Sequence, residues 1–230
     1  MRSRGIAHTH VHRFRWTWAA IAVVYLLFLL WHEPWLKSPL SAAELDIALK
    51  GMDSNQQVSE EEKVAIRAFF SNDDGKPFYN LNLMLYADRA VYADGLARPG
   101  IVTGADANEA YGRLVLPHLL RRGSYPLFTS SKIGAFLNEG ARGADFFQEV
   151  AIVRYRSRRD MLDMILDPEF KAGSPHKFAA LAKNVAVPTR GGLVLDLSIL
   201  VPLALLLLAL FAARRGPAAP DQGTSSSASM

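Results

Sequence analysis

The chain has 230 residues, of which 50% are hydrophobic and 21% are charged, and its formal net charge is +4. This composition excludes a wholly disordered chain, and the length allows one ordinary domain with additional segments. The chain has no cysteine, which excludes disulfide bonds and thiolate metal sites.

Apolar residues concentrate in two uncharged runs, at residues 16–31 and 197–213. Each run is close to the roughly 20 residues with which a helix spans a bilayer, and all four tryptophans flank the first run, as in an interfacial belt. The alternatives are a cleaved signal peptide at the front and a buried core helix at the back. We expect an uncleaved transmembrane helix over residues 16–35 and a second one over residues 193–213.

Basic residues lie outside both runs, at Arg2, Arg4, Arg13 and Arg15 before the first and at Arg214 and Arg215 after the second. The positive-inside rule then places a basic arm, residues 1–15, and a disordered tail, residues 214–230, in the cytoplasm. We therefore expect an integral protein of the bacterial inner membrane, with both termini cytoplasmic and a periplasmic or extracellular central domain. The lipid bilayer would be its partner through the two helices. No nucleic acid is expected, because the basic flanks account for the high pI.

Residues 36–73 are expected to form a helical linker. Ser41 with Glu44, and Ser59 with Glu62, have the spacing of capping boxes and predict two helix starts. The turn residues that follow at 72–76 predict the end of the second helix.

The first half of the domain at residues 74–190 is predicted to form a strand, a helix and a further strand. Residues 77–86 alternate between leucines and the set Asn80, Asn82 and Met84, which predicts a strand with two different faces. A helix follows, with a kink expected at Pro117 and a glycine cap at its end. One or two further β segments come next, with a bulge or bend expected at Gly134.

The second half begins with a β-branched and aromatic strand at residues 146–155. Ser157 predicts a helix start, and Pro168 and Pro175 each predict a restart of that helix. Residues 184–188 predict a short closing strand. The order βαββαβ indicates an α+β fold, a ferredoxin-like sandwich, flanked by an N-terminal and a C-terminal transmembrane helix.

Four segments carry a family resemblance: "KPFYNLNLMLY", "GADANEAYG", "VAIVRYRSRRDMLDMILDPEF" and "HKFAALAKNVAVPT". In order and spacing they resemble a bacterial family of domains of unknown function in the dimeric α+β barrel superfamily. Relatives usually show proline where Arg156 stands and arginine where Lys177 stands. The resemblance implies two ferredoxin-like units paired sheet to sheet, in a superfamily that includes monooxygenases, isomerases and haem-degrading enzymes. We therefore expect a homodimer formed through the face of Asn80, Asn82 and Met84.

Five residues are candidates for binding a ligand. His176 has the chemistry of an acid, a base or a ligand, and it is the candidate for catalysis; the alternative is a histidine that satisfies backbone groups at a helix start. Arg154 and Tyr155 leave their strand on opposite faces, so only one of them can face a given cavity; the alternatives are a surface ion pair and a core aromatic. Asn82 lines either a pocket or a dimer seam, and Tyr111 either reaches the same cavity or packs.

Two functions remain open on the sequence, and it does not decide whether the protein is an enzyme. The first is an uncharacterised membrane-anchored protein whose extracytoplasmic domain binds or transforms a small molecule. The second is a non-catalytic dimerisation scaffold for membrane partners. A cavity inside the domain would favour the first, and a filled interior would favour the second. With no phosphate loop, nucleophile elbow or zinc spacing, we expect no cofactor and no bound metal.

Overall fold

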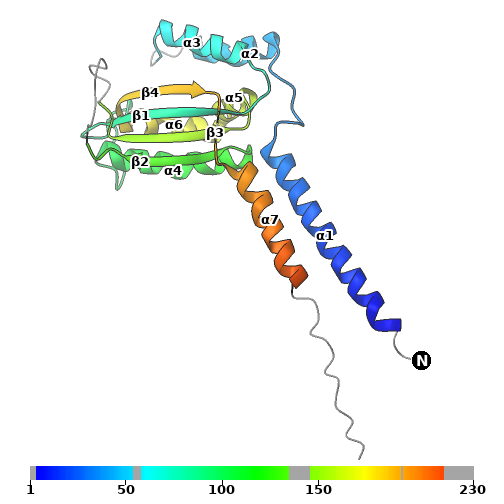
Figure 1. Ribbon diagram of the computed structural model, residues 1–230. Helices are drawn as coiled ribbons and strands as arrows, with labels where there is room; N and C mark the ends of the chain where they lie inside the picture. The colour runs from blue at the N-terminus through cyan, green and yellow to red at the C-terminus, as the bar shows by residue number, and fades with distance from the viewer. Residues whose placement is uncertain (1–3, 54–57, 135–145, 193, 215–230) are drawn as a thin grey trace, which may run out of the picture. The chain divides into compact units, whose positions relative to one another are not determined.

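The computed structural model describes residues 4–53, 58–134, 146–192 and 194–214. Its chain forms two compact units, one of Met1–Phe28 with Leu195–Met230 and one of Leu29–Val194. Helix α1 (Arg4–His32) begins in the first unit and ends in the second, and α7 (Leu197–Arg214) belongs to the first (Figure 1). Within the described residues, the second unit contains the sheet and the other five helices.

The two predicted membrane spans, at residues 16–35 and 193–213, are wrong. Among the residues that the structure describes, no helix combines the length and the apolarity needed to cross a membrane. The uncharged part of α1, residues 16–31, and the 18 residues of α7 are both shorter than the roughly 20 residues that span the hydrocarbon core. The expected contact with the lipid bilayer and the expected inner-membrane location both depended on these two spans, so both predictions are corrected as well. The predicted tail lies, from residue 215 on, outside the described residues.

The second unit continues with nine elements after α1. They are α2 (Ala42–Asp53), α3 (Glu60–Ser71), β1 (Phe78–Tyr86), α4 (Gly104–Arg121), β2 (Tyr125–Ser131), β3 (Glu149–Tyr155), α5 (Arg158–Leu166), α6 (Pro168–Ala180) and β4 (Leu181–Thr189).

The four strands form one antiparallel sheet in the order β2-β3-β1-β4. Strand β1 lies inside the sheet, where Asn82 pairs with Ala151 of β3 on one side and with Ala186 of β4 on the other. The register of β2 shifts between Pro126 and Phe128, because a proline has no N–H to donate to the ladder. The bulge predicted at Gly134 therefore lies elsewhere, near the start of β2.

The predicted fold class, a ferredoxin-like βαββαβ sandwich flanked by transmembrane helices, is corrected. The structure shows an α+β fold with a four-stranded antiparallel sheet and, among the described residues, seven helices. Two of them, α2 and α3, precede the first strand, and the connection from β3 to β4 contains two helices rather than one. The break comes from Asp167, which ends α5 and caps α6, and from the proline that follows it.

Helices α4 and α6 cover one face of the sheet and lie behind it in Figure 1. The side chains of Asn80, Asn82 and Met84 point to this covered face, because they line a cavity together with residues of α4 and α6. The predicted homodimer contact through these three residues is therefore wrong, since helices of the same chain occupy that face.

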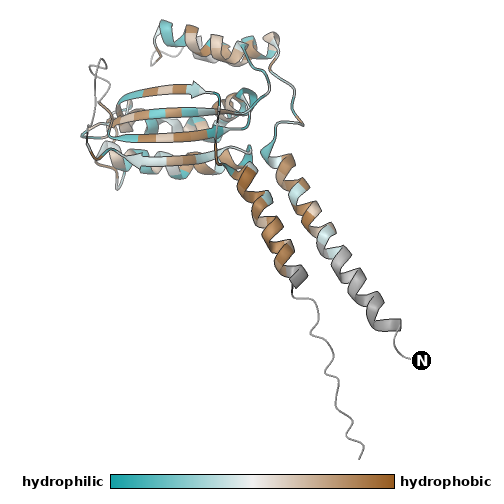
Figure 2. Ribbon diagram, in the orientation of Figure 1, coloured by the Kyte–Doolittle hydropathy of each residue, from teal (hydrophilic) through white to brown (hydrophobic). Residues whose placement is uncertain are grey.

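The opposite face of the sheet carries the leucines of β1 and the β-branched residues of its neighbours. Leu81 pairs with Ile152 and Val187, so the three side chains share that face. Figure 2 shows the hydrophobic segments along these strands. Val187 is 40% exposed and Phe128 is 48% exposed. The prediction that β1 has two different faces is therefore confirmed, but its apolar face is the outer one.

An aromatic cluster joins the covered face of the sheet to the helices. Phe78 and Tyr155 are opposite each other in the register and stack with ring centroids 5.1 Å apart. Leu119 of α4 and Met164 of α5 pack against them and are buried. This cluster packs the sheet against α4 and α5.

Side-chain caps fix where the helices begin. The capping boxes predicted at Ser41 and Ser59 are confirmed, since each serine and its glutamate exchange hydrogen bonds. Ser157 caps α5, and its Oγ accepts a hydrogen bond of 3.0 Å from the backbone N–H of Asp160. The angle at which α5 leaves β3 therefore depends on a local contact over three residues.

Replacing Ser157 by alanine is expected to lower the free energy of unfolding by about 1 kcal/mol, because the first turn of α5 loses its cap. Urea denaturation measures the effect, and Ser157→Thr, which keeps a hydroxyl, is the control. An unchanged midpoint for the alanine variant would show that the cap does not stabilise this junction.

Candidate functional site

The second unit contains a cavity of about 420 Å³ between the covered face of the sheet and the helices. Strands β1 to β4 supply its floor, and α3, α4, α5 and α6 supply its walls. Most of the lining is apolar, with Phe69, Val115, Leu119, Val153 and Met161 among its residues. Its volume lies within the roughly 300–1,000 Å³ that is typical of small-molecule sites.

The centre of the floor is a pair of amide side chains. Asn80 and Asn82 share a face because they are two residues apart on β1. The Nδ2 of Asn80 donates to the Oδ1 of Asn82 over 3.0 Å, and the Nδ2 of Asn82 donates to the carbonyl of Asn80 over 3.2 Å. These amides are largely satisfied by each other and by the strand, which fixes their orientation.

A second polar group at the floor of the cavity is centred on Glu149. The hydroxyl of Tyr86 donates to its Oε2 over 2.5 Å, and the Nδ2 of Asn108 donates to the Tyr86 oxygen over 3.0 Å. Burial and this carboxylate together raise the pKa of Tyr86 far above its ordinary value. The charge of Glu149 is therefore stabilised by a protonated phenol from β1.

Lys177 of α6 brings a positive charge to the cavity wall. It shares a helix face with Gly173 and Ala180, which are buried and lie four residues before it and three after it. Its Nζ lies 5.8 Å from the centre of the Tyr111 ring, and it forms no hydrogen bond or ion pair with any described residue. Burial lowers the pKa of this amine, because a charge in a poorly hydrated site is disfavoured.

Three more polar atoms in the cavity have no partner among the described residues. The hydroxyls of Tyr111 and Tyr155 make no hydrogen bond there, and the Oδ1 of Asn184 is buried without a donor. Burial raises the pKa of Tyr155 to about 12, and burial together with nearby Tyr155 raises the pKa of Tyr111 as well. Both phenols are therefore protonated donors at neutral pH.

The structure brings three of the five predicted ligand-binding residues together. Asn82, Tyr111 and Tyr155 line the cavity, whereas Arg154 and His176 do not. Arg154 and Tyr155 lie on opposite faces of β3, as adjacent strand residues must. Whether the three contact a ligand stays a prediction.

Arg154 is 1% exposed and holds the last turn of α1. Its Nη1 donates to the carbonyls of His32 and Gly123, each over 3.2 Å, and its guanidinium lies over the ring of Tyr125. Gly123 has φ +64°, and a Cβ there would lie 2.0 Å from the carbonyl oxygen of Trp31. A glycine is therefore required where the turn after α4 meets the end of α1.

His176 lies within α6 rather than in the first turn of a new helix. The predicted restart at Pro175 does not occur, because the helix continues from Pro168 to Ala180. The carbonyl of Lys171 loses its usual i+4 donor at this proline and instead accepts from the hydroxyl of Ser174 over 2.8 Å. The Nδ1 of His176 lies 2.6 Å from the hydroxyl of Tyr92, outside the cavity.

Sequence reasoning missed Lys177 and Asn184 as site residues. A signal existed for Lys177, since Gly173, Lys177 and Ala180 occur at the spacing of one helix face and small residues mark close packing. A charged residue between them is partly buried against its neighbours. Asn184 carried no comparable signal, because a polar residue in a strand is ordinarily exposed.

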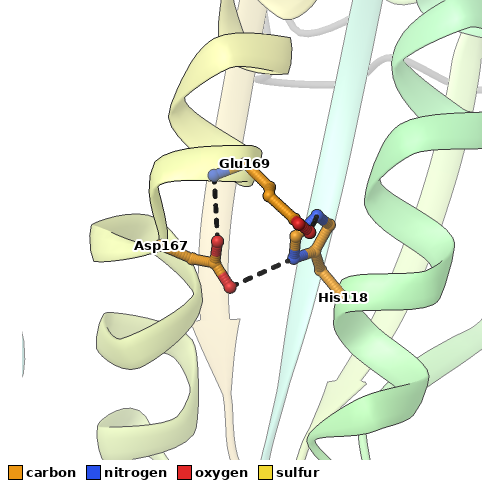
Figure 3. A group of neighbouring side chains, drawn as sticks. All are labelled: His118, Asp167 and Glu169. Atoms are coloured by element: carbon orange, nitrogen blue, oxygen red, sulfur yellow. Dashed lines mark hydrogen bonds and ion pairs between the residues drawn. The ribbon is translucent and has the colours of Figure 1, made fainter.

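One group of three possible metal ligands occurs among the described residues, outside the cavity: His118, Asp167 and Glu169. Figure 3 shows the His118 ring with the two carboxylates close to it. Its Nδ1 lies 3.5 Å from Asp167 Oδ2, and its Nε2 lies 4.0 Å from Glu169 Oε2.

Two guanidinium groups already neutralise these carboxylates. Arg122 donates to Asp167 Oδ2 over 2.7 Å, and Arg121 lies 3.4 Å from Glu169 Oε2. The hydrogen bond from Arg122 holds the pKa of Asp167 below its usual range. A divalent cation would add charge to a group that is already balanced, so the arrangement fits a histidine-containing ion-pair network better than a metal site.

The comparisons with known proteins identify no family. No family model and no curated protein matches the sequence. A crystal structure of a protein of unknown function from Rhodopseudomonas palustris is 26% identical over 59% of this chain and 95% of its own, with a TM-score of 0.48. The methylated form of that protein gives the same identity and TM-score over 93% of its length.

A hydroxynitrile lyase from Passiflora edulis is 15% identical over 53% of this chain and 98% of its own, with a TM-score of 0.34. None of these likenesses supplies a function for this chain. The assignment to the dimeric α+β barrel superfamily is corrected accordingly, since no family model matches the sequence.

Proposed function

We propose that the protein binds a small, largely apolar molecule in the cavity between the sheet and helices α4 and α6. The observation that carries the proposal is that the cavity retains polar groups without partners among the described residues: the Lys177 amine, two tyrosine hydroxyls and the Asn184 Oδ1. Buried polar groups in proteins are nearly always hydrogen-bonded, so a group left unpaired in a cavity calls for a ligand or ordered water.

The contrast within the cavity supports the proposal further. The Asn80 and Asn82 amides, and the Glu149 carboxylate with Tyr86, already bond to other parts of the chain. These contacts shape the floor. Two of the unpaired groups, on Lys177 and Tyr111, come from the helices, and two, on Tyr155 and Asn184, come from the sheet, so a ligand would be held from both sides. A scaffold that only joins partners needs no such interior.

A thermal-shift screen of small acidic, neutral and basic compounds on the full chain tests the proposal. A compound present at about 100 times its Kd is expected to stabilise the protein by about 2.7 kcal/mol. Ala151→Leu places a larger side chain in the cavity opposite Asn82, and it is expected to abolish the shift. Val150→Leu, on the other face of the same strand, is the matched control and is expected to retain it.

His176→Ala is a second control, because His176 does not line the cavity. The His176→Ala protein is expected to bind the same compounds as the wild type. The proposal is wrong if no compound shifts the wild type, or if the compounds shift Ala151→Leu as much as they shift Val150→Leu.

A further inference from the structure

Among the residues that the structure describes, two charged side chains line the cavity, and only one of them has a hydrogen-bond partner. Glu149 accepts a hydrogen bond from Tyr86, so its negative charge has a protein partner. Lys177 has an aromatic neighbour in Tyr111 but no carboxylate within ion-pair distance among the described residues. A cation that is poorly hydrated and unpaired is unstable in its charged form, and an anion brought by a ligand would relieve that cost.

Two hydrogen-bond donors line the same cavity as Lys177. Tyr111 lies beside Lys177, and Tyr155 is part of the same lining. Neither hydroxyl has an acceptor among the described residues. One ammonium and two phenols are three donor groups, and a carboxylate, with two oxygens and about four acceptor positions, can accept a hydrogen bond from each of them.

The rest of the cavity selects against a highly charged ligand. Its lining includes Phe69, Val115, Val153 and Met161, and Lys177 is the only lysine or arginine that lines it among the described residues. A phosphate or a dicarboxylate would bring at least one negative charge without a cation to meet it, which is costly in an apolar site. A single negative charge on an apolar body matches the lining.

We propose that the ligand of this cavity is a small monocarboxylate, whose carboxylate is bound by Lys177, Tyr111 and Tyr155 and whose apolar body fills the space beside them. This inference rests on the proposed function, because it names the class of molecule that the same cavity takes.

Calorimetric titration of the full chain with 3-phenylpropanoate and with 3-phenylpropan-1-ol tests the charge directly, since the two probes differ only at the end group. The wild type is expected to bind the carboxylate at least tenfold more tightly, which corresponds to one charge-assisted hydrogen bond of about 1.4 kcal/mol or more. Lys177→Met is expected to abolish this preference, and Tyr155→Phe to reduce it. Lys171→Met, on the same helix but exposed, is the control that keeps it.

The pH dependence adds an independent readout. Because a bound carboxylate favours the ammonium form, binding above the pKa of the free amine takes up a proton. Affinity for 3-phenylpropanoate is therefore expected to fall as the pH rises through that range, while affinity for the alcohol stays constant.

Each outcome decides between the two proposals. Equal binding of both probes by the wild type would overturn the carboxylate inference and leave ligand binding intact. Failure of both probes to bind would count against ligand binding itself. Thermal melts of the variants guard against misfolding, and Lys177→Met is expected to melt no lower than the wild type, because it removes a charge that is costly to bury.

Discussion

Asp160→Asn is expected to lower the free energy of unfolding by about 3–5 kcal/mol. Asp160 is 1% exposed and lies where α5, β3 and the segment after α1 meet. Arg156 binds its two oxygens with bonds of 2.7 and 2.6 Å, and Lys37 donates to it over 2.9 Å. An asparagine would leave Arg156 facing a neutral amide, whereas Lys37 keeps its ion pair with Asp163, so most of the loss comes from the uncompensated charge of Arg156.

The effect of this substitution should depend on pH. Burial alone would raise the pKa of Asp160, but the hydrogen bonds from Arg156, Lys37 and Ser157 outweigh it and hold the pKa below its ordinary value. A depressed pKa stabilises the fold fully above the pKa of the unfolded chain, about 3.9, and the stabilisation is lost as the pH falls through the folded value. The difference between wild type and variant is therefore expected to be largest near neutral pH and to shrink in acid.

Chemical denaturation at pH 7 and at pH 3 measures both effects, with Asp46→Asn as the control. Asp46 pairs with Arg67 on the surface, where an ion pair contributes little, so that variant should stay within about 0.5 kcal/mol of the wild type. If the two variants lose equal stability, Asp160 is not the centre of the junction.

Leu162→Ala is expected to cost about 2–5 kcal/mol. Leu162 is 3% exposed and packs with Leu45, Leu49 and Phe70, which join α5 to α2 and α3. Removing its side chain leaves a void that these helices cannot close without moving, so both the transfer energy and the cavity energy are lost. Because α3 also forms part of the cavity wall, ligand binding should weaken in the same variant.

Urea unfolding of Leu162→Ala is compared with that of Leu116→Ala, whose side chain on α4 is 40% exposed. The exposed leucine should lose much less stability than the buried one. A larger loss of stability for Leu116→Ala than for Leu162→Ala would show that the core had been assigned to the wrong leucine.

Local contacts were the part of the fold that the sequence predicted best. The capping boxes at Ser41 and Ser59 and the cap at Ser157 depend on residues three apart, and the structure contains all of them. The strand character of β1 and the break at Pro168 are equally local. Such features follow from backbone hydrogen bonding and proline geometry, which do not require knowledge of the rest of the chain.

Features that depend on tertiary packing were predicted poorly. Alternation along β1 shows that Leu81 and Asn82 face opposite ways, but it does not say which face the helices cover. Hydropathy alone suggested two membrane spans, because an apolar run does not show whether its helix is long enough to cross. Lys177 became a candidate only when α6 was placed against the sheet, since its chemistry depends on what surrounds it.

The most direct test of the account is a methyl NMR titration of the full chain with 3-phenylpropanoate. Binding in the cavity predicts that the largest shift changes occur at Val115, Leu119 and Val153, which line it. The methyl groups of Ile152 and Val187, on the opposite face of the sheet, should change little. Changes confined to those two residues, or no changes at saturating probe, would contradict the conclusion that this protein holds a small molecule between its sheet and its helices.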